Sequence, residues 1–118
     1  MTQVSPPSDM SLRDAADWAR GQTKRLAANF GLDMAADHER FALAQTAKLG
    51  EEVGELYAEV LGSLNYCRAA KAAQFTPDSL AGELADVMVC TLLLGEILNV
   101  DVASAVANKI SFLKDRQF

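Results

Sequence analysis

The chain repeats apolar residues every three or four positions in four separate segments, a spacing typical of amphipathic α-helices. Helices are predicted over residues 10–29, 37–62, 77–98 and 101–114. The expected N-caps, in chain order, are Ser8 or Asp9, Asp37, Thr76 and Asp101. The strongest of these signals is Thr76-Pro77, because Thr caps helix N-termini and Pro fits the first helical position. Residues 65–73 fit either a short extra helix or an extension of the second one.

The predicted helices differ in how their apolar residues are distributed. The 77–98 helix is apolar nearly all round, which predicts a helix buried on most sides. The 101–114 helix is amphipathic, and its expected inward positions are Val102, Val106, Ile110 and Leu113. In the 37–62 helix, Gly50 and Gly54 lower the helix propensity. Their four-residue spacing suggests close backbone packing at that point.

Composition supports one all-α domain that associates with itself. The 118 residues are 50% hydrophobic and 23% charged, with a net charge of −5. This length fits a single domain over residues 10–118, preceded by a flexible lead over residues 1–9. An acidic chain with scattered basic residues does not attract a nucleic-acid polymer. Because a small domain buries only a modest fraction of its surface, the apolar excess predicts a homodimer or a homotetramer.

Neither the apolar runs nor the cysteines indicate a membrane or secreted protein. The longest apolar run, residues 87–95, is too short and too close to acidic residues to cross a membrane. Residues 1–9 lack the apolar stretch of a secretory signal. Cys67 and Cys90 have no CxxC spacing, so neither a zinc site nor a disulfide framework is expected. Cys90 is expected to be a small buried apolar side chain. These features predict a cytoplasmic location without membrane contact.

Carboxylates at helical spacing are the most informative feature of the chain. Glu52 and Glu55 lie three residues apart in one predicted helix, and Glu83 and Asp86 do so in another. Residues at this spacing share a helix face. Glu51 can lean toward the same place as Glu55. Because Glu83 and Asp86 interrupt the most apolar helix, a solvated charged face does not explain them.

Carboxylates in such a setting need a cation, because burying a charge is costly unless it is paired. Between residues 41 and 108 the only basic residues are Lys48, Arg68 and Lys71. Carboxylates that face one another repel and raise one another's pKa. A donor set made only of oxygen atoms predicts Mg²⁺, with Mn²⁺ as an alternative. Glu59, one turn beyond Glu55, is expected at the surface or beside the ligands.

The segments around these acids resemble a known family. They are Lys48-Leu49-Gly50-Glu51-Glu52-Val53-Gly54-Glu55-Leu56 and Gly82-Glu83-Leu84-Ala85-Asp86-Val87. Together they resemble the EExxE…ExxD signature of the MazG-like all-α nucleoside triphosphate pyrophosphohydrolases, over residues 41–116. The resemblance implies a four-helix bundle completed by oligomerisation. It also implies Mg²⁺-dependent cleavage of a nucleoside triphosphate into the monophosphate and pyrophosphate, which serves nucleotide-pool house-cleaning.

The resemblance assigns roles to individual residues by motif position. The implied metal ligands are Glu52, Glu55, Glu83 and Asp86. Glu51 would orient or deprotonate the attacking water. On the last helix, the implied phosphate contacts are Asn108, Lys109 and Arg116, although the chain lacks the Tyr-Pro ending of some relatives. Bound cations reverse the sign of an acidic site, so a triphosphate can enter it.

The preferred base and the choice among related functions stay open at this level. Residues that could stack on a base are Trp18, Phe30, His38, Phe41, Tyr57 and Tyr66, of which Trp18 and Phe41 are expected to be packing residues. One alternative is a related enzyme that acts on phosphoribosyl-ATP or on a modified nucleotide. Another is a non-catalytic helical regulatory module, which the intact set of five acids disfavours. A di-iron carboxylate bundle requires Glu-x-x-His pairs, and the single histidine, His38, is not in one.

Overall fold

The computed structural model describes residues 9–66 and 75–116. Within them lie four helices, α1 (Leu12–Asn29), α2 (His38–Ser63), α4 (Pro77–Ile97) and α5 (Val102–Lys114). These helices make up 78% of the described residues, which contain no strand, so the all-α prediction is confirmed. Residues 1–8 of the predicted lead lie outside the described residues, as do residues 67–74, which include Cys67 and most of the undecided segment 65–73. No single described helix has the length and apolar content to cross a membrane; α4 and α5 reach those limits only as a pair bent by 114°.

The start signals of α4 and α5 act as the sequence predicts. The Thr76 hydroxyl accepts a hydrogen bond from the backbone N–H of Ser79 (3.1 Å), and the Ser79 hydroxyl accepts one from the Thr76 N–H (2.9 Å). At α5, the Asp101 carboxylate accepts from the Ser104 N–H at 3.0 Å. Hydrogen bonds lower the pKa of Asp101 to about 2; those from Ser104 have the largest effect, and the one from Arg13 has the next largest. The predicted Thr76 and Asp101 caps are therefore confirmed.

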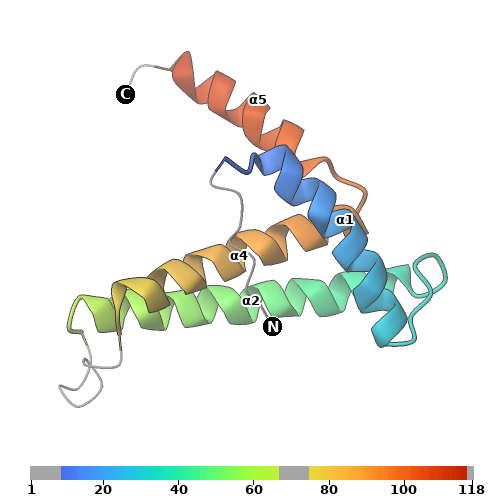
Figure 1. The fold of residues 1–118 in the computed structure, drawn as a ribbon, viewed down its shortest axis with the longest axis horizontal. Coiled ribbons are helices and arrows are strands. Elements are labelled where there is room, and N and C mark those ends of the chain that lie inside the picture. The colour runs from blue at the N-terminus through green and yellow to red at the C-terminus, as the bar shows by residue number, and fades with distance from the viewer. Residues whose placement is uncertain (1–8, 67–74, 117–118) are drawn as a thin grey trace.

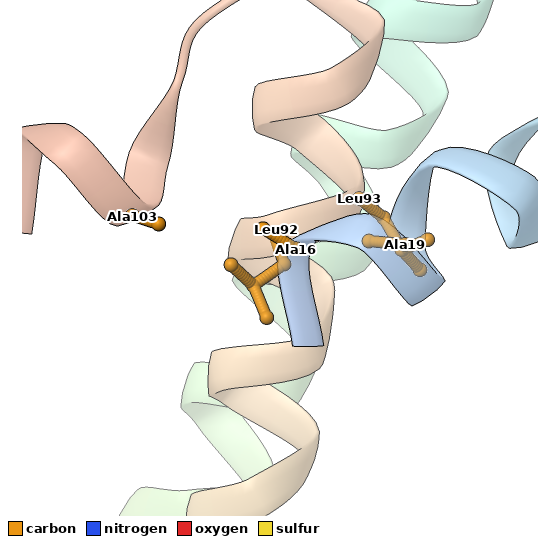
Figure 2. Packing of buried hydrophobic residues seen from close by; sticks show 5 residues of the cluster. All are labelled: Ala16, Ala19, Leu92, Leu93 and Ala103. Carbon is orange, nitrogen blue, oxygen red and sulfur yellow. The ribbon is translucent and has the colours of Figure 1, made fainter. Parts of the chain in front are cut away.

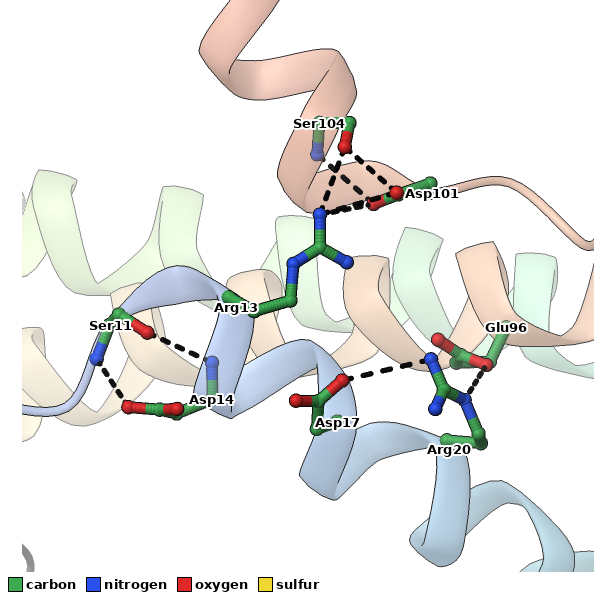
Figure 3. Close-up of polar contacts among 8 residues, drawn as sticks. All are labelled: Ser11, Arg13, Asp14, Asp17, Arg20, Glu96, Asp101 and Ser104. Carbon is green, nitrogen blue, oxygen red and sulfur yellow. Dashed lines mark hydrogen bonds and ion pairs between the residues drawn. The ribbon is translucent and has the colours of Figure 1, made fainter.

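The predicted cap of α1 is wrong. The helix begins at Leu12, and its N-cap is Ser11 in place of Ser8 or Asp9. The Ser11 hydroxyl accepts from the Asp14 N–H (3.0 Å), and the Asp14 carboxylate accepts from the Ser11 N–H (3.1 Å) (Figure 3). This capping box has Asp at the position where Glu or Gln is usual, so the motif is harder to detect in the sequence.

Helices α2 and α4 run antiparallel and side by side, and α1 crosses them at one end of the pair (Figure 1). That end, where α2 begins and α4 finishes, is called the covered end and contains Phe41, Cys90, Leu93 and Ile97. The opposite part of the pair is called the open end and contains Glu52, Glu55, Glu83, Leu84 and Met88. The distinction matters because α1 shields one end of the pair from water and leaves the other end accessible.

The hydrophobic core lies at the covered end. One buried cluster joins α1, α4 and α5 through Ala16, Ala19, Leu92, Leu93 and Ala103 (Figure 2). Alanines on α1 allow its backbone to approach α4 closely. A second cluster consists of Ala27, Phe41 and Ile97, and it joins α1 to the start of α2. The predicted packing role of Phe41 and the predicted burial of Cys90 are confirmed.

Polar contacts fix how the helices meet at this end. The Arg13 guanidinium pairs with the Asp101 carboxylate (3.0 Å) and donates to the Ser104 hydroxyl (2.9 Å), which ties α1 to α5 (Figure 3). Arg20 pairs with Glu96 of α4 at 3.6 Å. Such exposed pairs contribute little free energy, so their main effect is on orientation.

The open end and α5 are more exposed than the sequence predicts. Leu84 and Met88 are 50% and 58% exposed, so α4 is buried mainly in its C-terminal half. On α5, the expected inward side chains Val106, Ile110 and Leu113 are exposed in the single chain, and the helix points away from the α2–α4 pair (Figure 1). The radius of gyration is 17.1 Å, against about 13 Å for a compact domain of 100 residues. The described helices of one chain therefore do not close into a compact bundle.

The predicted close packing at the two glycines of α2 is also wrong within one chain. A Cβ atom added at Gly50 or Gly54 would meet no other atom within 4 Å. Both residues lie on the side of α2 that faces solvent. By helical spacing this side also carries Leu43 and Tyr57, which are 64% and 69% exposed. The open end thus presents small and apolar residues as well as carboxylates.

Candidate functional site

Three carboxylates from two helices converge at the open end. Glu52 and Glu55 project from α2, and Glu83 projects from α4. One oxygen atom from each of the three lies within 4.8 Å of the other two. The i, i+3 spacing on α2 places Glu52 and Glu55 on one face, and the antiparallel pairing brings Glu83 opposite them. These three residues are called the acidic cluster.

The acidic cluster contains buried oxygen atoms without hydrogen-bond partners. Glu52 is only 7% exposed, and Glu83 is partly buried. Within the described part of the chain, the Oε2 atoms of Glu52 and Glu83 are both shielded from solvent and unpartnered. An unsatisfied buried polar group costs about 1–3 kcal/mol, and more when it is charged. Since folded proteins rarely leave such atoms unpaired, these two oxygens mark a place where a cation or a hydrogen-bond donor could bind.

Burial and neighbouring negative charges disfavour the ionised form of Glu83. Burial raises the pKa of Glu83 above its usual value, and the charges of Glu55, Asp86, Glu52 and Glu59 raise it further. Both causes disfavour the ionised carboxylate. A bound cation would reverse both, because it supplies the opposite charge inside the cluster.

The geometry and the donor set fit a hard divalent cation. Oxygen atoms on opposite sides of Mg²⁺ are about 4 Å apart, given Mg–O distances of about 2.0–2.1 Å. Carboxylate oxygens that already lie within 4.8 Å of one another can therefore share one ion after small side-chain adjustments. No thiol or imidazole belongs to this group, which favours Mg²⁺ or Mn²⁺ over softer metals.

Among the described residues, Lys48 is the cation that pairs with a carboxylate of this cluster. Its Nζ atom lies 3.1 Å from Oε1 of Glu52 and 3.7 Å from Oε2 of Glu51. The hydrogen bond to Glu52 and the charges of Glu52, Glu51 and Glu55 raise the pKa of Lys48 above its usual value. Sequence reasoning counted Lys48 among the few nearby basic residues but gave it no role. Its i, i+4 spacing from Glu52 is the signal that could have done so.

The other predicted acids lie around the acidic cluster. The Glu51 side chain is 68% exposed and pairs only with Lys48 among the contacts of the described residues. Asp86 is exposed, yet its charge contributes to the raised pKa of Glu83. Glu59 accepts a hydrogen bond from the Ser79 hydroxyl at 3.0 Å, so it links α2 to the first turn of α4. Glu59 thus has a structural partner beside the cluster.

The predicted phosphate-contacting residues lie elsewhere in the molecule. Asn108 and Lys109 are exposed on α5, and Arg116 follows this helix. Lys109 and Arg116 approach the ring of Phe112, with their cationic groups 5.6 Å and 5.5 Å from its centroid. Because α5 points away from the α2–α4 pair (Figure 1), the structure does not bring these side chains to the acidic cluster of their own chain.

A cavity of about 640 Å³ lies next to Lys48, and the three carboxylates of the acidic cluster are not part of its wall. It lies between α1, α2 and α4, and its wall is mainly apolar, with Trp18, Phe30, Phe41 and Leu93 among the lining residues. Lys48 lines the same cavity, so one side chain borders both the cavity and the cluster. Burial raises the pKa of the Cys90 thiol in this wall. A volume of this size suits a small organic ligand.

The cavity separates the six aromatic residues that the sequence offers as possible stacking residues. Trp18, Phe30 and Phe41 line it, and Phe30 is 72% exposed. Tyr57 and Tyr66 are exposed and do not belong to its wall. His38 places Nε2 2.8 Å from the carbonyl oxygen of Ile97, so this ring links α2 to the end of α4. The periodicity of one sequence cannot show which aromatic residues share a cavity.

Comparison with protein-family models, with curated proteins and with solved structures finds no match for this chain.

Proposed function

We propose that the chain is a Mg²⁺-dependent nucleoside triphosphate pyrophosphohydrolase, which releases a nucleoside monophosphate and pyrophosphate. One observation carries the proposal: Glu52, Glu55 and Glu83 converge, and two of their buried oxygens have no partner. The similarity of the surrounding segments to the EExxE…ExxD signature supports it. The adjoining cavity supports it further, because a nucleotide combines an aromatic base with a charged phosphate chain.

In this proposal each residue has a role that follows from its position. Glu52, Glu55 and Glu83 hold the cation, and Asp86 completes the acidic surroundings on α4. When bound, Mg²⁺ neutralises phosphate charge and lowers the pKa of coordinated water. Glu51 is exposed beside the cluster, where its carboxylate can orient a water molecule or accept a proton from it. The apolar cavity takes the nucleoside and excludes water from it.

The proposal includes self-association, as a homodimer or a homotetramer. Apolar side chains exposed in one chain include Leu43, Leu84, Met88 and Ile110. Since α5 points away from its own acidic cluster, we assign the phosphate contacts implied for Asn108, Lys109 and Arg116 to a second copy. Sedimentation at micromolar concentration tests this part, and a monomer there would contradict it.

A substrate panel tests the proposed activity. The purified chain is incubated with Mg²⁺ and each of the common ribo- and deoxyribonucleoside triphosphates, with phosphoribosyl-ATP added to cover the related reaction. We expect equal amounts of pyrophosphate and monophosphate from at least one substrate, and no product when EDTA is present. Release of inorganic phosphate alone, or no release from any substrate, would refute the proposal.

A further inference from the structure

Along the face of α2 that packs against α4, the side chains change from apolar to acidic toward the C-terminal end of the helix. Phe41, Gln45, Lys48, Glu52 and Glu55 follow one another at spacings of three or four residues and so share this face. They run from an aromatic ring through an amide and an ammonium group to two carboxylates. Across the interface, α4 runs in the opposite direction and presents Leu93 and Cys90 to the cavity and Glu83 to the acidic cluster.

Lys48 lies where the apolar and acidic parts of this face meet. Its ammonium group is 3.1 Å from Glu52, and its side chain also lines the cavity. Arg40 is the other basic residue in the cavity wall, but it pairs with Asp37 at 3.8 Å, toward the start of α2. Among the described residues, Lys48 alone both lines the cavity and pairs with a carboxylate of the cluster.

We propose that Lys48 binds the α-phosphate of the nucleotide and positions it between the nucleoside cavity and the metal-binding carboxylates. This inference rests on the proposed function and deepens it. An ammonium group has three donors, and Glu52 accepts from one of them, so the others can reach a phosphate oxygen. A nucleotide laid along α2 with its base in the cavity places its α-phosphate beside Lys48 and its outer phosphates beside the acidic cluster.

The same position means that Lys48 should weaken the binding of a metal ion, although it should strengthen the binding of a phosphate. Without nucleotide, its positive charge lies beside Glu52 and repels a divalent cation that approaches the same carboxylates. Removal of this charge should therefore strengthen metal binding and weaken phosphate binding. A lysine that only maintained the shape of the site would affect both in the same direction, which makes the pair of measurements diagnostic.

The experiment compares Lys48→Met and Lys48→Arg with the control Lys24→Met. Lys24 is exposed on α1 and, by helical spacing, lies opposite the cavity-lining Gln22 and Leu26. Calorimetry in EDTA measures binding of AMP, GMP, CMP, UMP and TMP and of their parent nucleosides. Electron paramagnetic resonance measures Mn²⁺ binding without nucleotide. Thermal denaturation and circular dichroism check that each variant is folded.

We expect Lys48→Met to weaken binding of the preferred monophosphate by about tenfold or more, the usual size of a lost charge-assisted hydrogen bond. Nucleoside binding should change by less than about twofold, and Mn²⁺ affinity should be higher. Lys48→Arg should retain most of the monophosphate affinity, which provides a test even if Lys48→Met does not fold. Lys24→Met should match the wild type in every measurement.

Two results would overturn this assignment while leaving the proposed function intact. One is an unchanged monophosphate affinity in Lys48→Met. The other is an equal loss of monophosphate and nucleoside binding, which would show that the lysine only shapes the cavity. If the wild type neither binds these nucleotides nor releases pyrophosphate, the proposed function fails, and this assignment fails with it.

Discussion

Buried polar groups near the two ends of the α2–α4 pair differ in whether they have hydrogen-bond partners. At the covered end, the Thr23 hydroxyl donates to the carbonyl of Ala19 at 2.8 Å, and the Gln45 amide donates to the carbonyl of Cys90 at 3.3 Å. At the open end, Glu52 and Glu83 each keep a buried oxygen without a partner. On one face of α2, the buried Gln45 therefore has its hydrogen-bond partner, whereas the buried Glu52 keeps one oxygen without a partner.

This difference separates a region that supports the packed fold from the region of the proposed site. A buried polar group that already has its partner contributes to a single packed arrangement. A buried carboxylate oxygen without a partner costs free energy unless the group is protonated or gains a cation or a donor. The position of helix α1 accounts for part of the contrast, because α1 crosses the pair at the covered end and not at the open end (Figure 1).

The largest expected effect is on activity, from Glu52→Gln at the open end. This change keeps the size of the side chain and removes the charge that would bind a cation. We expect turnover to fall by more than about a hundredfold, since groups that merely support a metal ligand already cost about ten- to hundredfold. Pyrophosphate release is the measurement, and the helical circular dichroism spectrum should be nearly unchanged.

The matched control is Glu39→Gln, an exposed glutamate in the first turn of α2 and outside the acidic cluster. It should retain wild-type turnover. Equal losses in the two variants, or full activity in Glu52→Gln, would contradict the assignment of Glu52 as a metal ligand.

The next largest effect is on stability, from Ile97→Ala at the covered end. Ile97 is 2% exposed and packs with Ala27 and Phe41. Truncation should lower the free energy of unfolding by about 3 kcal/mol, as measured by urea denaturation. The comparison variant Leu84→Ala, on the same helix and 50% exposed, should lose less than about 1 kcal/mol at low protein concentration. Similar losses of unfolding free energy in Ile97→Ala and Leu84→Ala would show that both side chains are equally well packed, which would contradict the contrast between the two ends.

Much of the fold could be predicted because helix ends have local chemical signals. Thr76-Pro77 and Asp101 satisfy orphan backbone N–H groups through their own side chains, so neighbouring residues suffice to identify them. The direction that α5 takes could not be predicted in this way. Amphipathic spacing shows that Val106 and Ile110 share a face, but it does not say whether the same chain covers that face.

The candidate site could be predicted in part, because the spacing of residues along one helix is also a local signal. Spacing within each helix groups Glu52 with Glu55, and the antiparallel pairing of α2 and α4 then adds Glu83. Sequence spacing could not show that Asp86 lies outside this group or that Lys48 borders the cavity. Those facts depend on the rotation of one helix against the other and on the side chains contributed by α1.

The pH dependence of stability should have opposite signs at the two ends. The folded-state pKa of Glu83 is raised above its usual 4.5, so the protonated form is favoured in the native state and ionisation destabilises it. Glu83→Gln should therefore raise the melting temperature at pH 7 in EDTA, and this gain should vanish below about pH 4.5. Added Mg²⁺ should stabilise the wild type more than this variant.

At the covered end, Asp101 behaves in the opposite way. Its folded-state pKa is lowered to about 2 from 3.8, so its contribution is present above pH 3.8 and is lost as the pH falls through about 2. Asp101→Asn should lower the melting temperature at pH 7 and lose this difference in strong acid. Parallel pH profiles for Glu83→Gln and Asp101→Asn would contradict the contrast between the two ends.

The smallest expected effect concerns the solvent-facing side of α2 at the open end. Because a Cβ atom at Gly50 would meet no atom within 4 Å, Gly50→Ala should stabilise the single chain by about 0.5–1 kcal/mol through helix propensity. Urea denaturation at low concentration measures this gain, and sedimentation measures self-association. A loss of stability that grows with protein concentration would mean that a second copy approaches the α2 backbone at this glycine. Self-association would then cover the small-residue side of α2 and leave the acidic cluster, on the opposite side, accessible to its ligand.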